Sequence, residues 1–305
     1  MDLFFNEWKE SLKIIADSRS DVGTVFFFIW GCFWGSFINV CIYRLPIGRS
    51  IVYPGSSCPH CGQPISWWAN IPLISFLMLK AKCYYCYNSI SLRYPAIELV
   101  TGLLCAFLFQ FTGGLTWEFI YYFVFVNMLT VIFFIDLDHW IILDSITLYG
   151  CVFGFLGSLF LRFRPAVLVD MYPQLASINT GKWLQWSNML DSLLGMMLGY
   201  LLFMTIAFAG SVMLRQEAMG GGDVKFAALI GAFLGGQSAA IAFVVSFFLG
   251  FIYAVPMLIL RRKKGKDPVP FGTFMALAAL ITMIWKDDML TWFLNVQAFF
   301  YQQMW

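Results

Sequence analysis

Three consecutive glycines and one aspartate stand directly ahead of a long apolar run in EAMGGGDVKFAALIGAFLGG, residues 217–236. An ionisable side chain such as Asp223 at the edge of a membrane helix is a candidate functional residue. Glycine lacks a Cβ, so Gly220 and Gly222 would let an extended peptide lie beside this carboxylate. A helix starting just after Gly222 would also point free N–H groups at developing negative charge. The competing interpretation is that Asp223 serves only as the N-cap of this helix.

The composition of the whole chain indicates a membrane protein. Of the 305 residues, 60% are hydrophobic and 12% are charged, and the mean hydropathy is +0.76, whereas soluble domains average about 45–50% apolar and about 25% charged residues. A net charge of +2 gives no indication of nucleic-acid binding. We therefore expect an all-α polytopic protein with about eight transmembrane helices in the lipid bilayer. The apolar runs near spanning length are 22–43, 95–112, 117–135, 141–162, 189–213, 223–236, 238–260 and 270–286.

Lysine and arginine in the loops predict the orientation, because cytoplasmic loops are enriched in them. The segment from 44 to 94 contains no acidic residue, and RRKKGK at 261–266 is a second basic loop on the same side if eight helices span the bilayer. Both termini would then face outward. The acidic residues before 22 are untypical of a cleaved signal peptide, so we expect the first span to be retained. The turns carrying Asp136 and Asp223 would both face the cytoplasm.

The segment from 44 to 94 also carries the pairs CPHC at 58–61 and CYYC at 83–86. Two C-x2-C turns supply the four thiolates of a tetrahedral Zn²⁺ site, and such a closed site is structural. Two disulfides are the alternative, which the reducing cytoplasm disfavours. We expect three regions: an N-terminal segment with the first span (1–43), a cytoplasmic zinc-binding domain (44–94) and a transmembrane region that carries both acidic turns (95–305). The expected zinc ligands are Cys58, Cys61, Cys83 and Cys86.

A second acidic cluster follows an apolar run in VIFFIDLDHWIILD, residues 131–144. Asp136 would stand at the cytoplasmic lip of a helix, as would Asp223. Asp138 and His139 are also consistent with solvated turn residues, and Asp144 with a helix cap. Lys225 is consistent with binding to anionic lipid head groups. None of these features identifies a reaction by itself.

Taken together, the motifs closely resemble those of the bacterial type IV prepilin leader peptidases, from about residue 31 to residue 285. The resemblance implies a multi-pass inner-membrane aspartic protease whose two catalytic aspartates face the cytoplasm. It also implies cleavage of prepilins or type II secretion pseudopilins just after a glycine, and in many members methylation of the new N-terminus with S-adenosylmethionine. The motifs are GSFINVCIYRLP (35–46), the two cysteine pairs, RYPAIEL (93–99), FIDLDHWIILDSIT (134–147), EAMGGGDVKF (217–226) and PFG (270–272).

Carried over by motif, the catalytic pair falls on Asp136 and Asp223. Supporting roles fall on Gly220, Gly222, Asp138, Asp144 and Lys225. The chain departs from the family pattern at Leu143, where proline is usual, at CYYCYN, where a glycine-bearing turn is common, and at 163–188, which is identified as an insertion. The sequence makes no prediction of the oligomeric state or of the particular pilin substrate.

Two adjacent carboxyl groups suit direct attack by water, because they cannot both ionise cheaply and so share a proton. One accepts a proton from water while the other donates to the scissile carbonyl. The alternative function is a polytopic transporter with a zinc-stabilised loop, which would place carboxylates near mid-membrane. Presenilin-like and archaeal preflagellin peptidases share the aspartates and lack the cysteine loop. A pure methyltransferase is disfavoured because no Gly-rich nucleotide-binding unit is visible.

Overall fold

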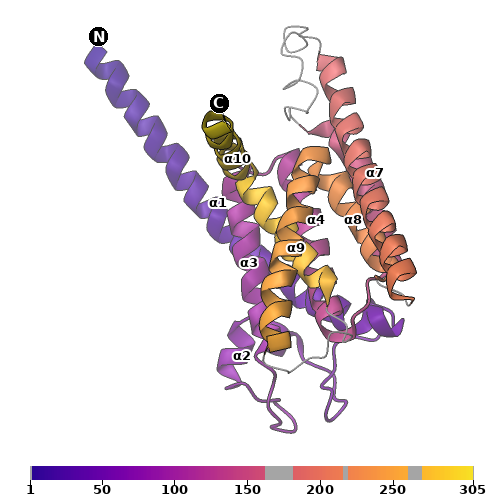
Figure 1. The fold of residues 1–305 in the computed structure, drawn as a ribbon. Coiled ribbons are helices and arrows are strands. Elements are labelled where there is room, and N and C mark those ends of the chain that lie inside the picture. Colours follow the sequence, from indigo (N-terminus) through magenta and orange to yellow (C-terminus); the bar gives the residue numbers. More distant parts are fainter. Residues whose placement is uncertain (1, 162–180, 216–218, 260–269, 305) are drawn as a thin grey trace. The chain divides into compact units, whose positions relative to one another are not determined.

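The computed structural model describes residues 2–161, 181–215, 219–259 and 270–304. Regular structure within these ranges is helical, apart from two isolated β-bridges (Figure 1). The long helices are α1 (Asp2–Arg44), α3 (Arg93–Phe111), α4 (Trp117–His139), α5 (Asp144–Gly157), α7 (Gly181–Leu214), α8 (Gly221–Leu234), α9 (Gly236–Ile259) and α10 (Phe271–Met304). The short elements are η1 (Leu45–Ile47), η2 (Trp67–Asn70), α2 (Ile74–Met78) and η3 (Ser158–Phe160).

Each of the eight apolar runs in the sequence forms one of these long helices, which confirms an all-α membrane protein. Five stretches in the described ranges are long and apolar enough to cross a bilayer by themselves. Helix α8 has 14 residues, about 21 Å at 1.5 Å per residue, against a hydrocarbon core of about 30 Å. It therefore needs other helices around it. The five candidate spans are Asp21–Ile47, Arg93–Phe111, Trp117–His139, Trp186–Met213 and Gly236–Met257.

The chain folds as two compact units, Met1–Asn127 and Met128–Trp305. In the first unit, α1 packs closely along α3, and glycine makes this approach possible. A Cβ on Gly35 would lie 2.7 Å from Glu98 Cα, and one on Gly31 would lie 2.6 Å from Cys105 Cβ. Because real Cβ atoms do not approach so closely, any larger residue at either position would force the helices apart.

In the second unit, α8 is enclosed by its neighbours. Every residue from Phe226 to Leu234 is buried, and α7 lies directly alongside (Figure 1). A Cβ on Gly231 would lie 2.0 Å from the carbonyl oxygen of Gly195, and one on Gly199 would lie 2.4 Å from that of Ala227. Small residues thus bring the two backbones into contact, as is common in membrane helix pairs. This contact holds α8 against α7 and so fixes the position of its N-terminus, where Asp223 lies.

A single-residue turn joins α8 to α9, and α10 has a break within it. Gly235, with φ +77°, alone separates α8 from α9, so the turn is tighter than the expected Gly235-Gly236-Gln237. The Asp191 carboxylate on α7 accepts a hydrogen bond from the Gly236 N–H at 3.0 Å, which caps α9. Helix α10 breaks at Trp285, where φ is −114° and ψ is 21°. The last expected span ends beside this break.

Some sequence predictions fall outside the described residues. These include Glu217, the basic run 261–266 and most of the expected insertion 163–188. The end of that insertion is described and is helical, because α7 begins at Gly181. The helix therefore extends N-terminally beyond the apolar run at 189–213.

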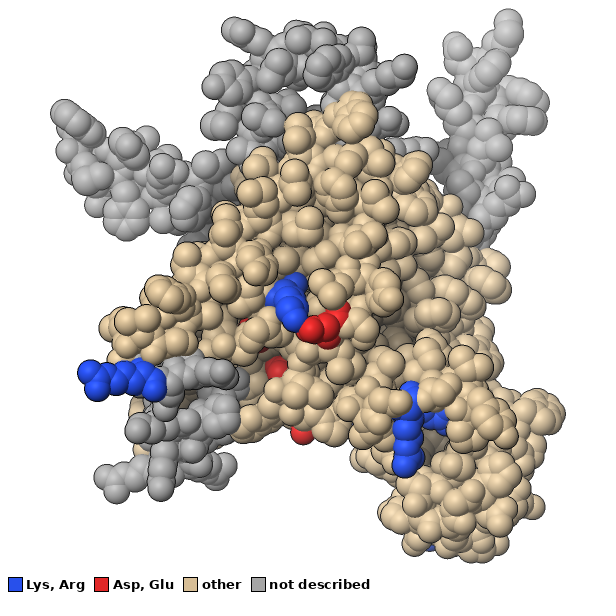
Figure 2. Space-filling view, turned by 90° about the vertical axis from the view of Figure 1, so that its right-hand side faces the viewer, with Lys and Arg blue, Asp and Glu red and all other residues tan. Residues whose placement is uncertain are grey.

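The described surface carries few charges. On the face drawn in Figure 2, almost the whole described surface is uncharged, with blue and red atoms confined to a few places. Large apolar side chains such as Val244, Phe248 and Phe251 are more than half exposed. Exposed apolar area on this scale is stable only against lipid, which fits a multi-pass membrane protein.

Candidate active site and metal centre

Asp136 is a buried carboxyl group at the end of α4. It is 4% exposed, and its Oδ2 atom accepts two hydrogen bonds from Thr273: one from the backbone N–H at 2.7 Å and one from Oγ1 at 3.0 Å. Thr273 is the third residue of α10, so this carboxyl group meets the positive end of a helix dipole. A buried acid needs such donors because lipid and apolar side chains supply none.

Glycines bring the helix ends together around Ile142. A Cβ on Gly272 would lie 2.8 Å from Ile142 Cδ1 and 3.0 Å from Asp136 Oδ2. A Cβ on Gly222 would lie 3.0 Å from Ile142 Cβ. Ile142 therefore fills the space between the starts of α8 and α10, and any side chain at Gly272 would collide with the carboxyl group.

Asp223 is the third residue of α8 rather than its N-cap. The N-cap is Gly220, with φ −71° and ψ 145°, so the interpretation of Asp223 as a plain N-cap is wrong. The Asp223 carboxyl group is half-buried, accepts a hydrogen bond from the Gly220 backbone and interacts electrostatically with Asp136. The structure thus brings together two acids that are far apart in the sequence.

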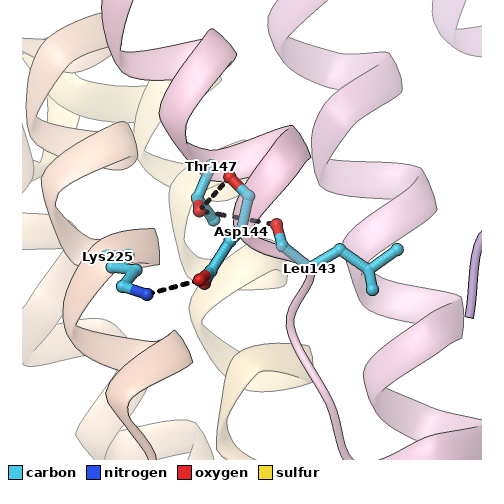
Figure 3. Close-up of polar contacts among 4 residues, drawn as sticks. All are labelled: Leu143, Asp144, Thr147 and Lys225. Carbon is cyan, nitrogen blue, oxygen red and sulfur yellow. Dashed lines mark hydrogen bonds and ion pairs between the residues drawn. The ribbon is translucent and has the colours of Figure 1, made fainter.

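Lys225 pairs with Asp144 across the starts of α8 and α5 (Figure 3). Lys225 Nζ lies 2.6 Å from Asp144 Oδ2, and the two side chains are 39% and 59% exposed respectively. Thr147 Oγ1 donates to the Asp144 carbonyl at 3.1 Å. The expected contact of Lys225 with lipid head groups is replaced here by a protein partner. An exposed pair of this kind contributes about 1 kcal/mol or less, so it orients the two helix starts more than it stabilises the fold.

The other residues of the 131–144 cluster lie at the surface. Asp138 and His139 are exposed at the end of α4, and the helix stops where Trp140 adopts φ +57°. Leu143 has an extended backbone with φ −80° and ψ 124°. These angles suit the proline that is usual at this position, so leucine keeps the same turn before α5.

The four cysteines of the first unit form one cluster. Their Sγ atoms all lie within 4.8 Å of one another, and all are free thiols, which does not support the disulfide alternative. Cys58 Sγ and Cys86 Sγ are 3.8 Å apart, close to the edge of about 3.8 Å that a tetrahedron with Zn–S bonds of about 2.3 Å requires. The donor set fits a structural Zn²⁺ ion with no open coordination position. The ligating atoms would come from Cys58, Cys61, Cys83 and Cys86.

The turns 58–63 and 83–88 have the same hydrogen-bond pattern. In each, the first cysteine N–H donates to the carbonyl five residues later, and the residue four places on donates back to that cysteine. The distances are 2.9 and 2.9 Å in the first turn, and 2.8 and 3.0 Å in the second. The backbone N–H groups of Cys86 and Tyr85 lower the pKa of the Cys83 thiol to about 7, whereas burial and the neighbouring thiols raise that of Cys86 to about 11. Without a metal ion, Cys83 is therefore the thiol that ionises more readily of these two.

Sequence reasoning did not assign Thr273, Ile142 or Glu98 to a site. Thr273 follows the PFG motif, which was the available signal for it. Glu98 is buried on α3, and its Oε2 accepts a hydrogen bond from the Leu73 N–H at 2.9 Å. It anchors the loop that leads into α2. Ile142 lies within the motif at 134–147, but its side chain gave no sign of its role, because that role depends on two glycines from other helices.

Comparison with known proteins identifies the family. Residues 29–111 match the bacterial peptidase A24 N-terminal domain, and residues 123–255 match the type IV leader peptidase family. Together these matches cover most of the chain. No solved structure matched it.

Curated relatives agree with this assignment. A prepilin leader peptidase/N-methyltransferase of Aeromonas salmonicida (strain A449) is 31% identical over 88% of this chain and 92% of its own length. Proteins with the same name from Pseudomonas aeruginosa and Myxococcus xanthus (strain DK1622) are 30% and 37% identical, over 88% and 79% of this chain and 92% and 65% of their own lengths. The chain belongs to the type IV leader peptidase family. The transporter alternative finds no support.

Proposed function

We propose that this chain is a membrane aspartic endopeptidase that removes the leader of type IV prepilins or type II secretion pseudopilins after a glycine and methylates the new N-terminus. Family membership and the shared name of the relatives support both activities. The observation that carries the peptidase assignment is the approach of Asp136 and Asp223 around Ile142, which lies against both Gly222 and Gly272. No serine or cysteine nucleophile is needed.

In the proposed mechanism, one carboxylate of the pair takes a proton from water as the water oxygen bonds to the scissile carbonyl carbon. The protonated partner donates to the carbonyl oxygen, so a neutral tetrahedral intermediate forms. Transfer of a proton to the amide nitrogen then allows the C–N bond to break. The products are a leader ending in a carboxyl group and a pilin with a free amino group, which is the methyl acceptor.

Supporting roles follow from the contacts described above. Gly222 leaves room for Ile142, and Gly220 supplies a backbone hydrogen bond to Asp223. The Lys225–Asp144 pair orients the starts of α8 and α5. Asp138 is exposed two residues after Asp136, and we propose that it contacts the substrate.

We propose Zn²⁺ as the occupant of the cysteine cluster and S-adenosylmethionine as the methyl donor. The four thiols support the first proposal, and the N-methyltransferase relatives support the second. The proposed location is the bacterial inner membrane with the carboxyl pair facing the cytoplasm, an orientation supported by the basic segment 44–94. A prepilin has a basic leader followed by a hydrophobic helix, so its cleavage point would lie at that surface.

The test is cleavage of a purified prepilin by Asp136→Asn and Asp223→Asn variants, followed by mass spectrometry. Both variants are expected to leave the leader attached. Asp191→Asn is the matched control, because Asp191 caps α9 and asparagine keeps an acceptor oxygen for the Gly236 N–H. Full cleavage by either active-site variant would exclude the proposed pair. A mass gain of one methyl group on the mature product tests the second activity.

A further inference from the structure

Thr273 makes the described polar contacts between α10 and the proposed catalytic pair. Its backbone N–H and its hydroxyl both donate to Oδ2 of Asp136, at 2.7 and 3.0 Å. Thr273 is itself 5% exposed, so its hydroxyl does not exchange this contact for water. One oxygen of the carboxyl group is thus fixed by two donors from a single residue.

The neighbouring residue leaves the Asp136 carboxyl group little freedom to turn. Gly272 places its backbone so close that a Cβ there would lie 3.1 Å from Asp136 Cγ. With Oδ2 held by α10, Oδ1 is the oxygen left to act on water. A carboxyl group that is fixed before substrate arrives loses less freedom in the transition state.

We propose that Thr273 is a positioning residue that holds the Asp136 carboxyl group in its reactive orientation for peptide cleavage. This inference rests on the proposed function of the Asp136–Asp223 pair. Thr273 acts through Asp136 and does not contact the reacting atoms. Its hydroxyl and its backbone N–H work together, so a side-chain substitution removes only one of two donors.

The experiment compares Thr273→Val and Thr273→Ser in the full-length enzyme with a purified prepilin. Valine keeps the shape of threonine and removes the hydroxyl. With one of the two donors to Oδ2 removed, the Asp136 carboxyl group is freer to turn, so we expect kcat to fall by about tenfold or more. The KM for prepilin should change little, because Thr273 is buried and acts through Asp136. Thr273→Ser retains a hydroxyl and should restore most of kcat.

Thr282→Val is the matched control. Thr282 lies on the same helix, is fully buried, and its hydroxyl has no hydrogen-bond partner in the described part of the chain. The same substitution there should leave kcat and KM unchanged. Thermal unfolding of each variant in detergent shows whether a loss of activity reflects a loss of folding.

The outcomes separate this inference from the proposed function. If Thr273→Val cleaves at the wild-type rate while Asp136→Asn is inactive, the positioning role is overturned and the peptidase assignment stands. If Thr273→Val unfolds, the Thr273→Ser variant tests the positioning role instead. A folded Thr273→Ser variant whose kcat is about tenfold or more below the wild type also overturns the positioning role. If Asp136→Asn cleaves normally, the proposed function itself fails.

Discussion

Tyr87 holds a backbone conformation that glycine takes in the matching turn. Its φ is +57°, and Gly62, at the equivalent place four residues after the first cysteine of its pair, has φ +71°. The second turn keeps the hydrogen bonds of the first, with tyrosine in place of glycine. A non-glycine residue in the left-handed region costs roughly 1–2 kcal/mol. The second turn therefore carries local strain.

Removing the side chain at Tyr87 and adding one at Gly62 should shift zinc retention in opposite directions. Tyr87→Gly relieves the strain, and the tyrosine side chain is 73% exposed, so little packing is lost. Gly62→Ala introduces strain in open space, because no atom lies within 4 Å of an added Cβ. We expect the first variant to need more chelator, and the second less, to release half of the bound zinc. Equal chelator midpoints in the two variants would refute this account.

Helix α8 is shorter than the bilayer and depends on α7 for its position. Backbone contact between Gly231 and Gly195 permits this, and Ser192 Oγ adds a hydrogen bond to the Ala232 carbonyl at 2.7 Å. Because Asp223 stands in the first turn of α8, the packing of this helix fixes one half of the carboxyl pair. The packing of α8 against α7 therefore affects the position of Asp223 in the proposed catalytic pair.

Gly231→Ala should destabilise the protein, although alanine favours helices, because its Cβ would lie 2.0 Å from the Gly195 carbonyl oxygen. Overpacking of this kind costs about 1–3 kcal/mol. Thermal unfolding in detergent should show a lower midpoint. Gly221→Ala, on the same helix with no atom within 4 Å of the added Cβ, is the control and should unfold like the wild type. An unchanged midpoint for Gly231→Ala would show that α7 can move away.

At the scale of the whole molecule, the two candidate centres belong to different compact units. The cysteine cluster lies within Met1–Asn127, and the residues around Asp136 and Asp223 lie within Met128–Trp305. The expected functional boundaries after residues 43 and 94 stay a prediction. We therefore expect the peptidase centre to form without the zinc centre.

Removal of zinc should therefore affect the two activities unequally. Structural zinc sites lose their fold when the metal is withdrawn, so the variant Cys58→Ser with Cys83→Ser should lose zinc. We expect methylation of the mature pilin to be lost while leader cleavage continues, because we expect methyl transfer to involve the segment 44–94, whose basic character suits a carboxylate-bearing cofactor. Mass spectrometry of the product separates the two results. Cys151→Ser, which changes a cysteine of the second unit outside the cluster, is the control. Loss of leader cleavage in the zinc-free variant, or methylation of its cleaved product at the wild-type level, would contradict the expectation.

Apolar run length and local motifs determined which segments are helical and which residue types carry chemistry. Each run of sufficient hydrophobicity must satisfy its backbone hydrogen bonds internally in lipid, and a helix does this without distant partners. The C-x2-C turns likewise close through hydrogen bonds within six residues. For these reasons the helix positions, the cysteine site and the two aspartates could be read from the chain alone.

Contacts between distant segments could be decided only by the tertiary structure. Three such contacts join residues that are 80 or more positions apart in the sequence. They are the hydrogen bonds from Thr273 to Asp136, the ion pair of Lys225 with Asp144, and the packing of Ile142 against Gly222 and Gly272. A threonine or isoleucine has no pattern of its own that names its partner. The role of such a residue depends on which backbone lies next to it. That neighbour is determined by the packing of glycines between helices, and the local sequence does not determine how those helices pack.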